Sequence, residues 1–331
     1  MANPPTLIDK GERASIRGAR QPSASRTPTA AVVSWYRRHN RLGDLSAAAV
    51  LLTPTLVVLG VFVVYPIAYS GYLSLLAWDG LSAERTFVGL SNYLSLWRSG
   101  ELGNSIWVTL LYTAGVTVGG LAAGLGIAVL INAVVRGGST YRALYFLPVV
   151  TATVAVAVVW KLLLDPGSGY VNVVLRQLGA SPPSWLRDPN WAMPAVVLVG
   201  IWKRIGFNVV VFMAGLQAIP RDVYEAAEVD GAGGWALLRY VTVPLLAPMT
   251  LLLAIMSVID SFLVFDQIFI MTGGGPVGAT ETLGLLLYRH AFRYFDLGTA
   301  SAVGWVMFAL IAGISITQWR MSRTGSRGVQ L

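Results

Sequence analysis

Long apolar runs alternate with polar segments along most of the chain after residue 44. A helix needs about 20 apolar residues to cross the hydrocarbon core of a bilayer. Runs of this length predict an all-α integral membrane protein with six transmembrane helices. The predicted helices cover residues 45–69, 106–135, 143–164, 193–216, 245–271 and 297–319. Pro54 and Pro66 predict kinks in the first of them, and the glycines of the second predict close contact with another helix.

The same pattern divides the chain into four regions. Residues 1–44 are basic and polar and lack apolar periodicity up to about residue 30, which favours a disordered cytoplasmic tail over a signal peptide. Residues 45–103 are expected to hold the first transmembrane helix and an outer loop. Residues 104–319 are expected to form a transmembrane core of five helices, and residues 320–331 a second cytoplasmic tail.

The distribution of positive charge predicts the orientation of these helices. Lys and Arg gather in both tails and in alternate loops, which places both termini and residues 220–244 in the cytoplasm of a multi-pass cell-membrane protein. The net charge of +8 therefore reflects contact with membrane lipid and orientation. We expect no nucleic-acid partner.

Composition excludes several kinds of site. Only 12% of the 331 residues are charged and 55% are hydrophobic, whereas soluble domains carry about 25% charged residues. The chain has no Cys and two His, so we expect no metal site. Lys10, Lys161 and Lys203 all lie outside any Gly-Lys-Ser/Thr phosphate-binding loop. We therefore expect no cofactor in this chain, and energy for any active transport from a partner or an ion gradient.

The longest polar interruption in the second half of the chain is residues 220–244, which we call the bracket. Asp222 and Glu225 have the spacing of a helix capping box, and Asp230-Gly231 predicts a helix end. A second short helix is expected to follow, before Pro244. The pattern predicts a helix-turn-helix unit at the membrane surface, although a solvated loop would have a similar composition.

The bracket resembles the EAA loop of binding-protein-dependent ABC permeases. Glu225-Ala226-Ala227, Gly231 and Val243-Pro244 have the spacing of that motif, with Val241 and Val243 in place of Ile and Leu. The resemblance implies a coupling helix that docks on a cytoplasmic ATPase. The ATPase-coupling residues that it implies are Tyr224, Glu225, Ala226, Ala227, Asp230, Gly231, Ala232 and Pro244.

Two predicted outer loops carry further motifs. Residues 89–93 read Gly-Leu-Ser-Asn-Tyr and residues 272–276 read Thr-Gly-Gly-Gly-Pro. Both resemble the sugar-type branch of the same family, in particular the first permease of maltose, lactose or glycerol-phosphate systems. The resemblance implies a second homologous permease, two ATPase subunits that bind ATP-Mg, and an extracytoplasmic solute-binding protein as partners.

Polar residues inside the predicted helices form a second candidate site. Charges within a membrane are costly, so they are usually paired or functional. Asp260 could lock two helices by pairing with Lys203 or Arg204, or it could line a translocation path for a carbohydrate or glycerol-phosphate-like solute; the two interpretations are compatible. The candidate path residues are Trp202, Lys203, Asn208, Ser257, Asp260, Ser261, Phe265 and Gln267.

Two other classes of protein fit the sequence less well. A polytopic membrane enzyme would need acidic or His residues clustered at one face, and the bracket carboxylates Asp222, Glu225, Glu228 and Asp230 could mimic such a cluster. No Asp-x-Asp or His pair supports that interpretation. A secondary transporter is disfavoured by the EAA spacing and by the absence of apparent internal repeats. The sequence therefore favours a transport subunit without catalytic residues of its own.

Overall fold

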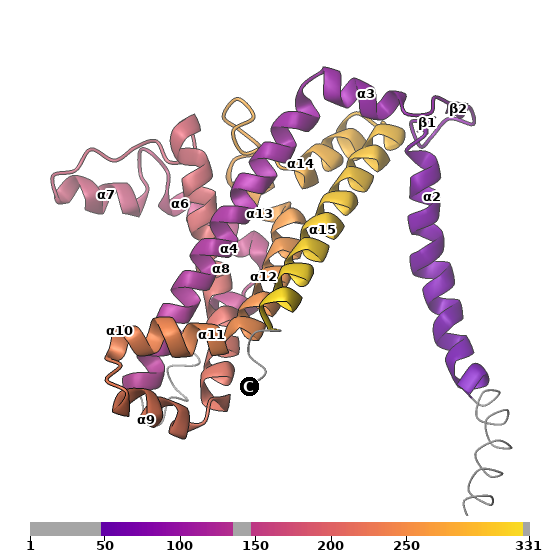
Figure 1. Ribbon diagram of the computed structural model, residues 1–331. Coiled ribbons are helices and arrows are strands. Elements are labelled where there is room, and N and C mark those ends of the chain that lie inside the picture. The colour runs from indigo at the N-terminus through magenta and orange to yellow at the C-terminus, as the bar shows by residue number, and fades with distance from the viewer. Residues whose placement is uncertain (1–47, 135–146, 327–331) are drawn as a thin grey trace, which may run out of the picture. The chain divides into compact units, whose positions relative to one another are not determined.

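The computed structural model describes residues 48–134 and 147–326, and most of them are helical (Figure 1). They fall into two units that divide between Pro66 and Ile67, and every site discussed below lies in the second unit. The helices of the first half are η1 (Gly60–Val64), α2 (Tyr65–Leu73), α3 (Ser91–Arg98), α4 (Glu101–Val134), α6 (Thr153–Leu163) and α7 (Tyr170–Gln177). Those of the second half are α8 (Pro189–Ala218), α9 (Arg221–Val229), α10 (Gly234–Ala236), η2 (Leu237–Thr242), α11 (Val243–Leu245), α12 (Ala247–Phe262), α13 (Asp266–Met271), α14 (Leu283–Tyr288), η3 (Arg289–Arg293) and α15 (Leu297–Ser326). The strands β1 (Leu76–Ala77) and β2 (Thr86–Phe87) form one antiparallel pair.

Four helices of the described residues are long and apolar enough to cross a membrane: Ala48–Leu73, Glu101–Asn132, Pro189–Ala218 and Leu297–Met321. A fifth crossing is present if Gly234–Leu245 and Ala247–Phe262, which meet at 66°, count as one span. The predicted helix at 143–164 is represented by the shorter α6, because the chain is not helical at Thr151 and Ala152, which separate α6 from a helical turn at 147–150. Residues 135–146 lie outside the described range. Four or five of the six predicted crossings are therefore confirmed. The predicted tail at 1–44 also lies outside the described range.

Several boundaries differ from the prediction. The first helix continues to Leu73, and a π-helical segment, Gly60–Val64, ends just before Pro66. Proline lacks the N–H that would continue the regular pattern, and a π-bulge is one way to accommodate that loss. Helix α15 continues to Ser326, past the predicted end at residue 319. Short polar segments at a helix end do not stop a helix that begins in a long apolar run.

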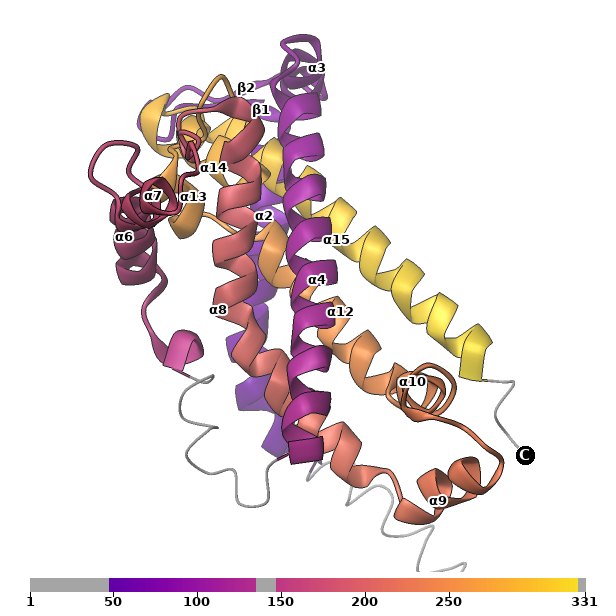
Figure 2. The same cartoon turned by 90° about the vertical axis from the view of Figure 1, so that its left-hand side faces the viewer.

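Helices α4 and α8 lie side by side in both views and form the centre of the bundle (Figures 1 and 2). Gly115, Gly119 and Gly124 of α4 have no room for a Cβ, because α8 side chains lie directly against them. At Gly124 the neighbour is Asn208 of α8, which is 1% exposed. The close contact predicted from the glycines is confirmed, and small residues allow it because they let two backbones approach.

A matched pair of glycines tests this contact. A Cβ at Gly124 would lie 2.6 Å from the Asn208 Cβ, whereas a Cβ at Gly126 would meet nothing within 4 Å. We expect Gly124→Ala to destabilise the bundle by about 1–3 kcal/mol through overpacking. Gly126→Ala is expected to leave stability unchanged or slightly higher, because Ala favours a helix. Thermal unfolding of the two purified variants measures the difference, and equal melting temperatures would contradict the contact.

The predicted helix at 245–271 is broken in the structure. Helix α12 ends at Phe262, and α13 begins at Asp266 after a turn at Leu263–Phe265. The Val264 carbonyl in this turn accepts a hydrogen bond from the Thr282 hydroxyl at 3.3 Å. Irregular backbone at membrane depth needs such a partner, because lipid supplies none. Sequence pattern alone missed the break, since Leu263, Val264 and Phe265 in the turn are themselves apolar.

At one end of the bundle, the first outer motif holds a loop in place. Asn92 of α3 donates from Nδ2 to the carbonyls of Ser74 and Leu76, both at 2.9 Å. Tyr93 donates its hydroxyl to Ser74 Oγ at 2.9 Å. Asn92 therefore satisfies two backbone carbonyls after the first helix and Tyr93 binds the Ser74 side chain, so the Asn-Tyr pair of this motif has a structural role.

Candidate functional site

The bracket lies at the end of the bundle opposite to α3 and α14 (Figures 1 and 2). Its first helix, α9, begins at Arg221, with Pro220 as N-cap and no side-chain capping hydrogen bond. The predicted capping box of Asp222 and Glu225 is therefore wrong, because Asp222 lies inside the first turn. An acidic residue there still interacts favourably with the positive end of the helix dipole.

The turn after α9 has the hydrogen bonds of a Schellman motif. Gly231 has φ +85°, and the Ala232 N–H donates to the Ala227 carbonyl at 2.9 Å. Asp230 is the C-cap residue. Because L-residues rarely adopt this φ, the turn favours glycine at position 231. The helix end predicted at Asp230-Gly231 is confirmed.

The second helix of the bracket is continuous from Gly234 to Leu245 and contains α10, η2 and α11. It is longer than predicted, and Pro244 lies within it, close to the bend that leads to α12. Tyr224 of α9 lies 3.2 Å from the Thr242 hydroxyl, oxygen to oxygen, which ties the two helices together. The bracket is therefore a folded unit of this chain.

The bracket presents small and acidic side chains to its surroundings. Glu225, Ala226, Asp230 and Pro244 are exposed, whereas Ala227 and Ala232 are half-buried. Glu225 forms no hydrogen bond or ion pair with any part of the chain that the structure describes. Its carboxylate is free to interact with another molecule.

Substitution at Gly231 tests whether the turn sets the shape of the bracket. Gly231→Ala places a Cβ at φ +85°, which costs roughly 1–2 kcal/mol. Gly233, which has φ −77° and open space around its Cα, supplies the matched control, Gly233→Ala. We expect hydrogen exchange of the Asp230–Ala232 amides to accelerate about 5- to 30-fold in the first variant only. Equal exchange in both variants would show that the turn is not held by glycine.

A partly open cavity of about 450 Å³, which we call the central cavity, is lined by both apolar and charged side chains. It is bounded by α4, α6, α8, α12 and the turn before α13. Five of the predicted path residues line it: Lys203, Asp260, Ser261, Phe265 and Gln267. These five residues line the same cavity although α12 ends at Phe262, before Phe265 and Gln267.

An ion pair crosses the wall of this central cavity. Arg204 Nη1 donates to Asp260 Oδ2 at 2.5 Å. The arginine side chain is 13% exposed and the aspartate side chain 60% exposed. The expected helix-locking pair is therefore present, with Arg204 as the partner, and the carboxylate still faces the cavity. Lys203 donates instead to the Thr151 carbonyl at 2.9 Å.

A buried amide fixes the opposite wall. Gln267 donates from Nε2 to the Val196 carbonyl at 2.6 Å and accepts the Tyr112 hydroxyl at 3.2 Å. These bonds join α13, α8 and α4. Tyr112 was missed by sequence reasoning, although a polar stripe at four-residue spacing on α4 (Ser105, Thr109, Thr113 and Thr117) could have revealed this buried face.

Three predicted path residues lie outside the cavity lining. Asn208 is packed against Gly120 and Gly124 of α4. Ser257 accepts the Thr117 hydroxyl at 2.9 Å in a buried contact between α12 and α4. Trp202 packs edge-on against Trp160 with ring centroids 5.7 Å apart. Apolar surroundings and helix periodicity could not separate a polar residue that lines a cavity from one that joins two helices.

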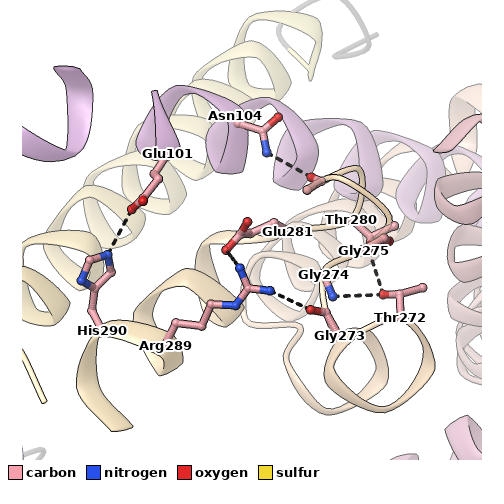
Figure 3. Close-up of polar contacts among 11 residues, drawn as sticks. Glu101, Asn104, Thr272, Gly273, Gly274, Gly275, Thr280, Glu281, Arg289 and His290 are labelled. Carbon is pink, nitrogen blue, oxygen red and sulfur yellow. Dashed lines mark hydrogen bonds and ion pairs between the residues drawn. The ribbon is translucent and has the colours of Figure 1, made fainter. Parts of the chain in front are cut away.

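The second outer motif lies in the loop between α13 and α14, and polar contacts hold this loop together (Figure 3). Thr280 donates its hydroxyl to the Gly275 carbonyl at 2.7 Å and lies 2.7 Å from the Thr272 hydroxyl. Arg289 pairs with Glu281 and donates to the Gly273 carbonyl at 2.8 Å. The loop is thereby bound to η3, and Gly274 makes room for the Arg289 and Leu285 side chains.

Comparisons with known proteins agree on one family. Residues 115–319 match the family described as binding-protein-dependent transport system inner membrane component. A sulfoquinovosyl glycerol transport system permease protein, SmoG, from Agrobacterium fabrum is 36% identical over 286 residues, which cover 86% of this chain and 92% of the relative. An sn-glycerol-3-phosphate transport system permease protein, UgpA, from Yersinia pestis is 35% identical over 273 residues, which cover 82% and 92%.

The fold also matches a solved structure. A chain of a bacterial ABC transporter involved in the import of the acidic polysaccharide alginate superposes with a TM-score of 0.73 at 23% identity, over 87% of this chain and 98% of that chain. At this identity the match concerns the fold alone. The family match and the relatives show that the chain belongs to the permease family of inner-membrane components of binding-protein-dependent ABC transport systems.

Proposed function

We propose that this permease forms half of a translocation path that carries a carbohydrate or glycerol-phosphate-like solute into the cytoplasm. The central cavity is the observation that supports it most. Lys203, Arg204, Asp260 and Gln267 line a space of about 450 Å³ between helices that are otherwise apolar. Polar groups at membrane depth face a protein partner or water, and they mark solute paths more often than lipid contacts.

The bracket supports a coupling role at the other end of the molecule. It exposes Glu225 and Ala226 on a helix whose end is fixed by Gly231. We infer that α9 docks in a groove of a cytoplasmic ATPase, so that closure of two ATPase subunits moves this helix and the path with it. In the proposed importer, both termini of the chain lie in the cytoplasm and the chain crosses the membrane six times. The importer also requires a second permease and an extracytoplasmic binding protein.

Two of the relatives are named for anionic solutes, and a third, 35% identical, is named as a trehalose/maltose transport system permease protein. SmoG is named for a sulfonated glycoside of glycerol, and UgpA for glycerol 3-phosphate. Both solutes are polar and anionic and combine hydroxyl groups with an acidic group. A cavity with Lys203 and an Arg204–Asp260 pair suits solutes of this kind, because charged side chains bind both hydroxyl and acidic groups.

Co-purification tests the assembly. The tagged chain is extracted from its native membrane in mild detergent, and the proteins that accompany it are identified. We expect an ATPase and a second permease to co-purify with ATP hydrolysis. A chain that leaves the membrane alone, under conditions that preserve the fold, would contradict the importer and reopen the membrane-enzyme interpretation.

A further inference from the structure

Three aromatic rings form a cluster between α13 and α14. Phe265 and Phe269 stack with centroids 5.2 Å apart and an interplanar angle of 26°. Tyr288 lies 4.8 Å from the first ring and 5.2 Å from the second. We call these three residues the aromatic cluster. Each ring contacts both others, so the cluster is a single apolar surface.

The aromatic cluster separates two cavities. Phe265 lines the central cavity. Phe269 and Tyr288 line a second space of about 470 Å³, the outer cavity, whose other lining residues are Gly273, Leu285, Arg289, Arg293 and Tyr294. Both volumes fall within the range of about 300–1,000 Å³ of small-molecule sites. A solute that leaves the outer cavity along the cluster would arrive at the central cavity.

The rings are not simply filling the core. Phe269 is 38% exposed, although Phe265 and Tyr288 each pack partly against buried residues. Rings that serve only to fill a core are usually buried on all sides. An aromatic face open to a polar space is suited to binding a flat apolar surface of a ligand.

Polar groups surround this aromatic surface. Arg289 is engaged by Glu281 and the Gly273 carbonyl (Figure 3). Arg293 is exposed and has no hydrogen bond or ion pair within residues 48–134 and 147–326. The outer cavity therefore combines one available guanidinium and the hydroxyl-bearing rings of Tyr288 and Tyr294 with the apolar face of Phe269.

We propose that the outer cavity is a second subsite, which selects solutes that contain a pyranose ring and passes them to the central cavity. A pyranose ring offers a face of C–H groups to an aromatic ring and hydroxyl groups at its edge to Arg293. An acyclic polyol phosphate has no such face. The inference rests on the proposed function, and it narrows the solute class to pyranosides.

Uptake kinetics in cells test the subsite. A strain that lacks this gene is complemented with each variant and given radiolabelled neutral and acidic pyranose disaccharides, acyclic polyols and glycerol 3-phosphate. We expect a pyranoside to be taken up. Phe269→Leu and Tyr288→Leu are each expected to raise its KM about 3- to 10-fold, because removal of an aromatic face from the subsite weakens solute binding by that factor. The maximal rate should stay within about twofold, since the central cavity is unchanged.

Two variants separate the subsite from a structural role. Phe269→Trp restores an aromatic face and should restore the KM. Phe292→Leu is the matched control, because Phe292 is 64% exposed and its ring contacts Tyr288 at 5.4 Å, yet it lines neither cavity. It should leave the KM unchanged. Arg293→Gln should raise the KM by a factor similar to that of the ring variants.

The outcomes distinguish this inference from the function on which it rests. Gene-dependent uptake of glycerol 3-phosphate or a polyol in preference to every pyranoside would overturn the subsite and leave the importer intact. Unchanged KM values in both ring variants would do the same. No gene-dependent uptake of any probe, with the chain present at normal levels in the membrane, would count against the proposed function itself.

Discussion

Glu225→Lys is expected to abolish solute uptake while the chain stays folded in the membrane. Glu225 is exposed on α9 and has no partner within the described residues, so its replacement breaks no interaction that holds the fold. Removal of a charged group from a docked interface costs about 2–5 kcal/mol. The proposed docking on an ATPase should therefore weaken by roughly 30-fold to several thousand-fold, and ATP hydrolysis should no longer respond to the solute.

Glu228→Lys is the matched control for this prediction. Glu228 lies one turn further along the same helix and is also exposed, but it falls outside the Glu-Ala-Ala motif. The substitution Glu228→Lys changes the net charge of α9 by the same amount as Glu225→Lys. Uptake and solute-stimulated ATP hydrolysis of the reconstituted transporter are compared in the two variants. Equal loss in both would assign the effect to charge in general, and normal uptake by Glu225→Lys would refute the coupling role.

The bracket shows how far local sequence determines local structure. Gly231 predicted a helix end because few other residues tolerate φ +85°, and the structure has that end at the predicted place. The capping box failed for an equally local reason. Pro220 is the N-cap residue and α9 begins one residue later, so Asp222 lies too far inside the helix to cap it. Two possible first residues of a helix that lie one or two positions apart are supported almost equally by the sequence.

Contacts between distant segments explain the other differences. The break at Leu263–Phe265 depends on Thr282, which lies 18 residues beyond Val264 and satisfies its carbonyl. Asn208 and Ser257 were predicted to line the path, but both lie in contacts between helices. Helix periodicity shows which residues share a face of one helix, and it does not show which helix lies opposite that face. The glycines of α4 face α8 at both Gly115 and Gly124, and this pairing places Asn208 in a helix interface. Only the packed structure supplies that information.

Asp260→Ala is expected to lower both stability and uptake. The substitution leaves the Arg204 guanidinium, which is 13% exposed, without its carboxylate. Nε and Nη2 of Arg204 already lack partners among the described residues, so the remaining charge has little compensation. Breaking a fully buried pair costs about 3–5 kcal/mol. Because Asp260 is 60% exposed, we expect a smaller loss of about 1–3 kcal/mol, measured by thermal unfolding of the purified transporter.

The double variant Arg204→Met with Asp260→Ala separates the two roles of this pair. Removal of both charges eliminates the uncompensated guanidinium, so we expect stability to return to near the wild-type value. A pair that only locks α8 to α12 would then recover uptake as well. The exposed carboxylate faces the central cavity, where it can accept hydrogen bonds from solute hydroxyls. We therefore expect the stable double variant to remain at least about tenfold slower in uptake, since removal of a hydrogen bond to a charged group costs about 1.5–3 kcal/mol. Full recovery of uptake together with stability would reduce Asp260 to a structural role and remove it from the path.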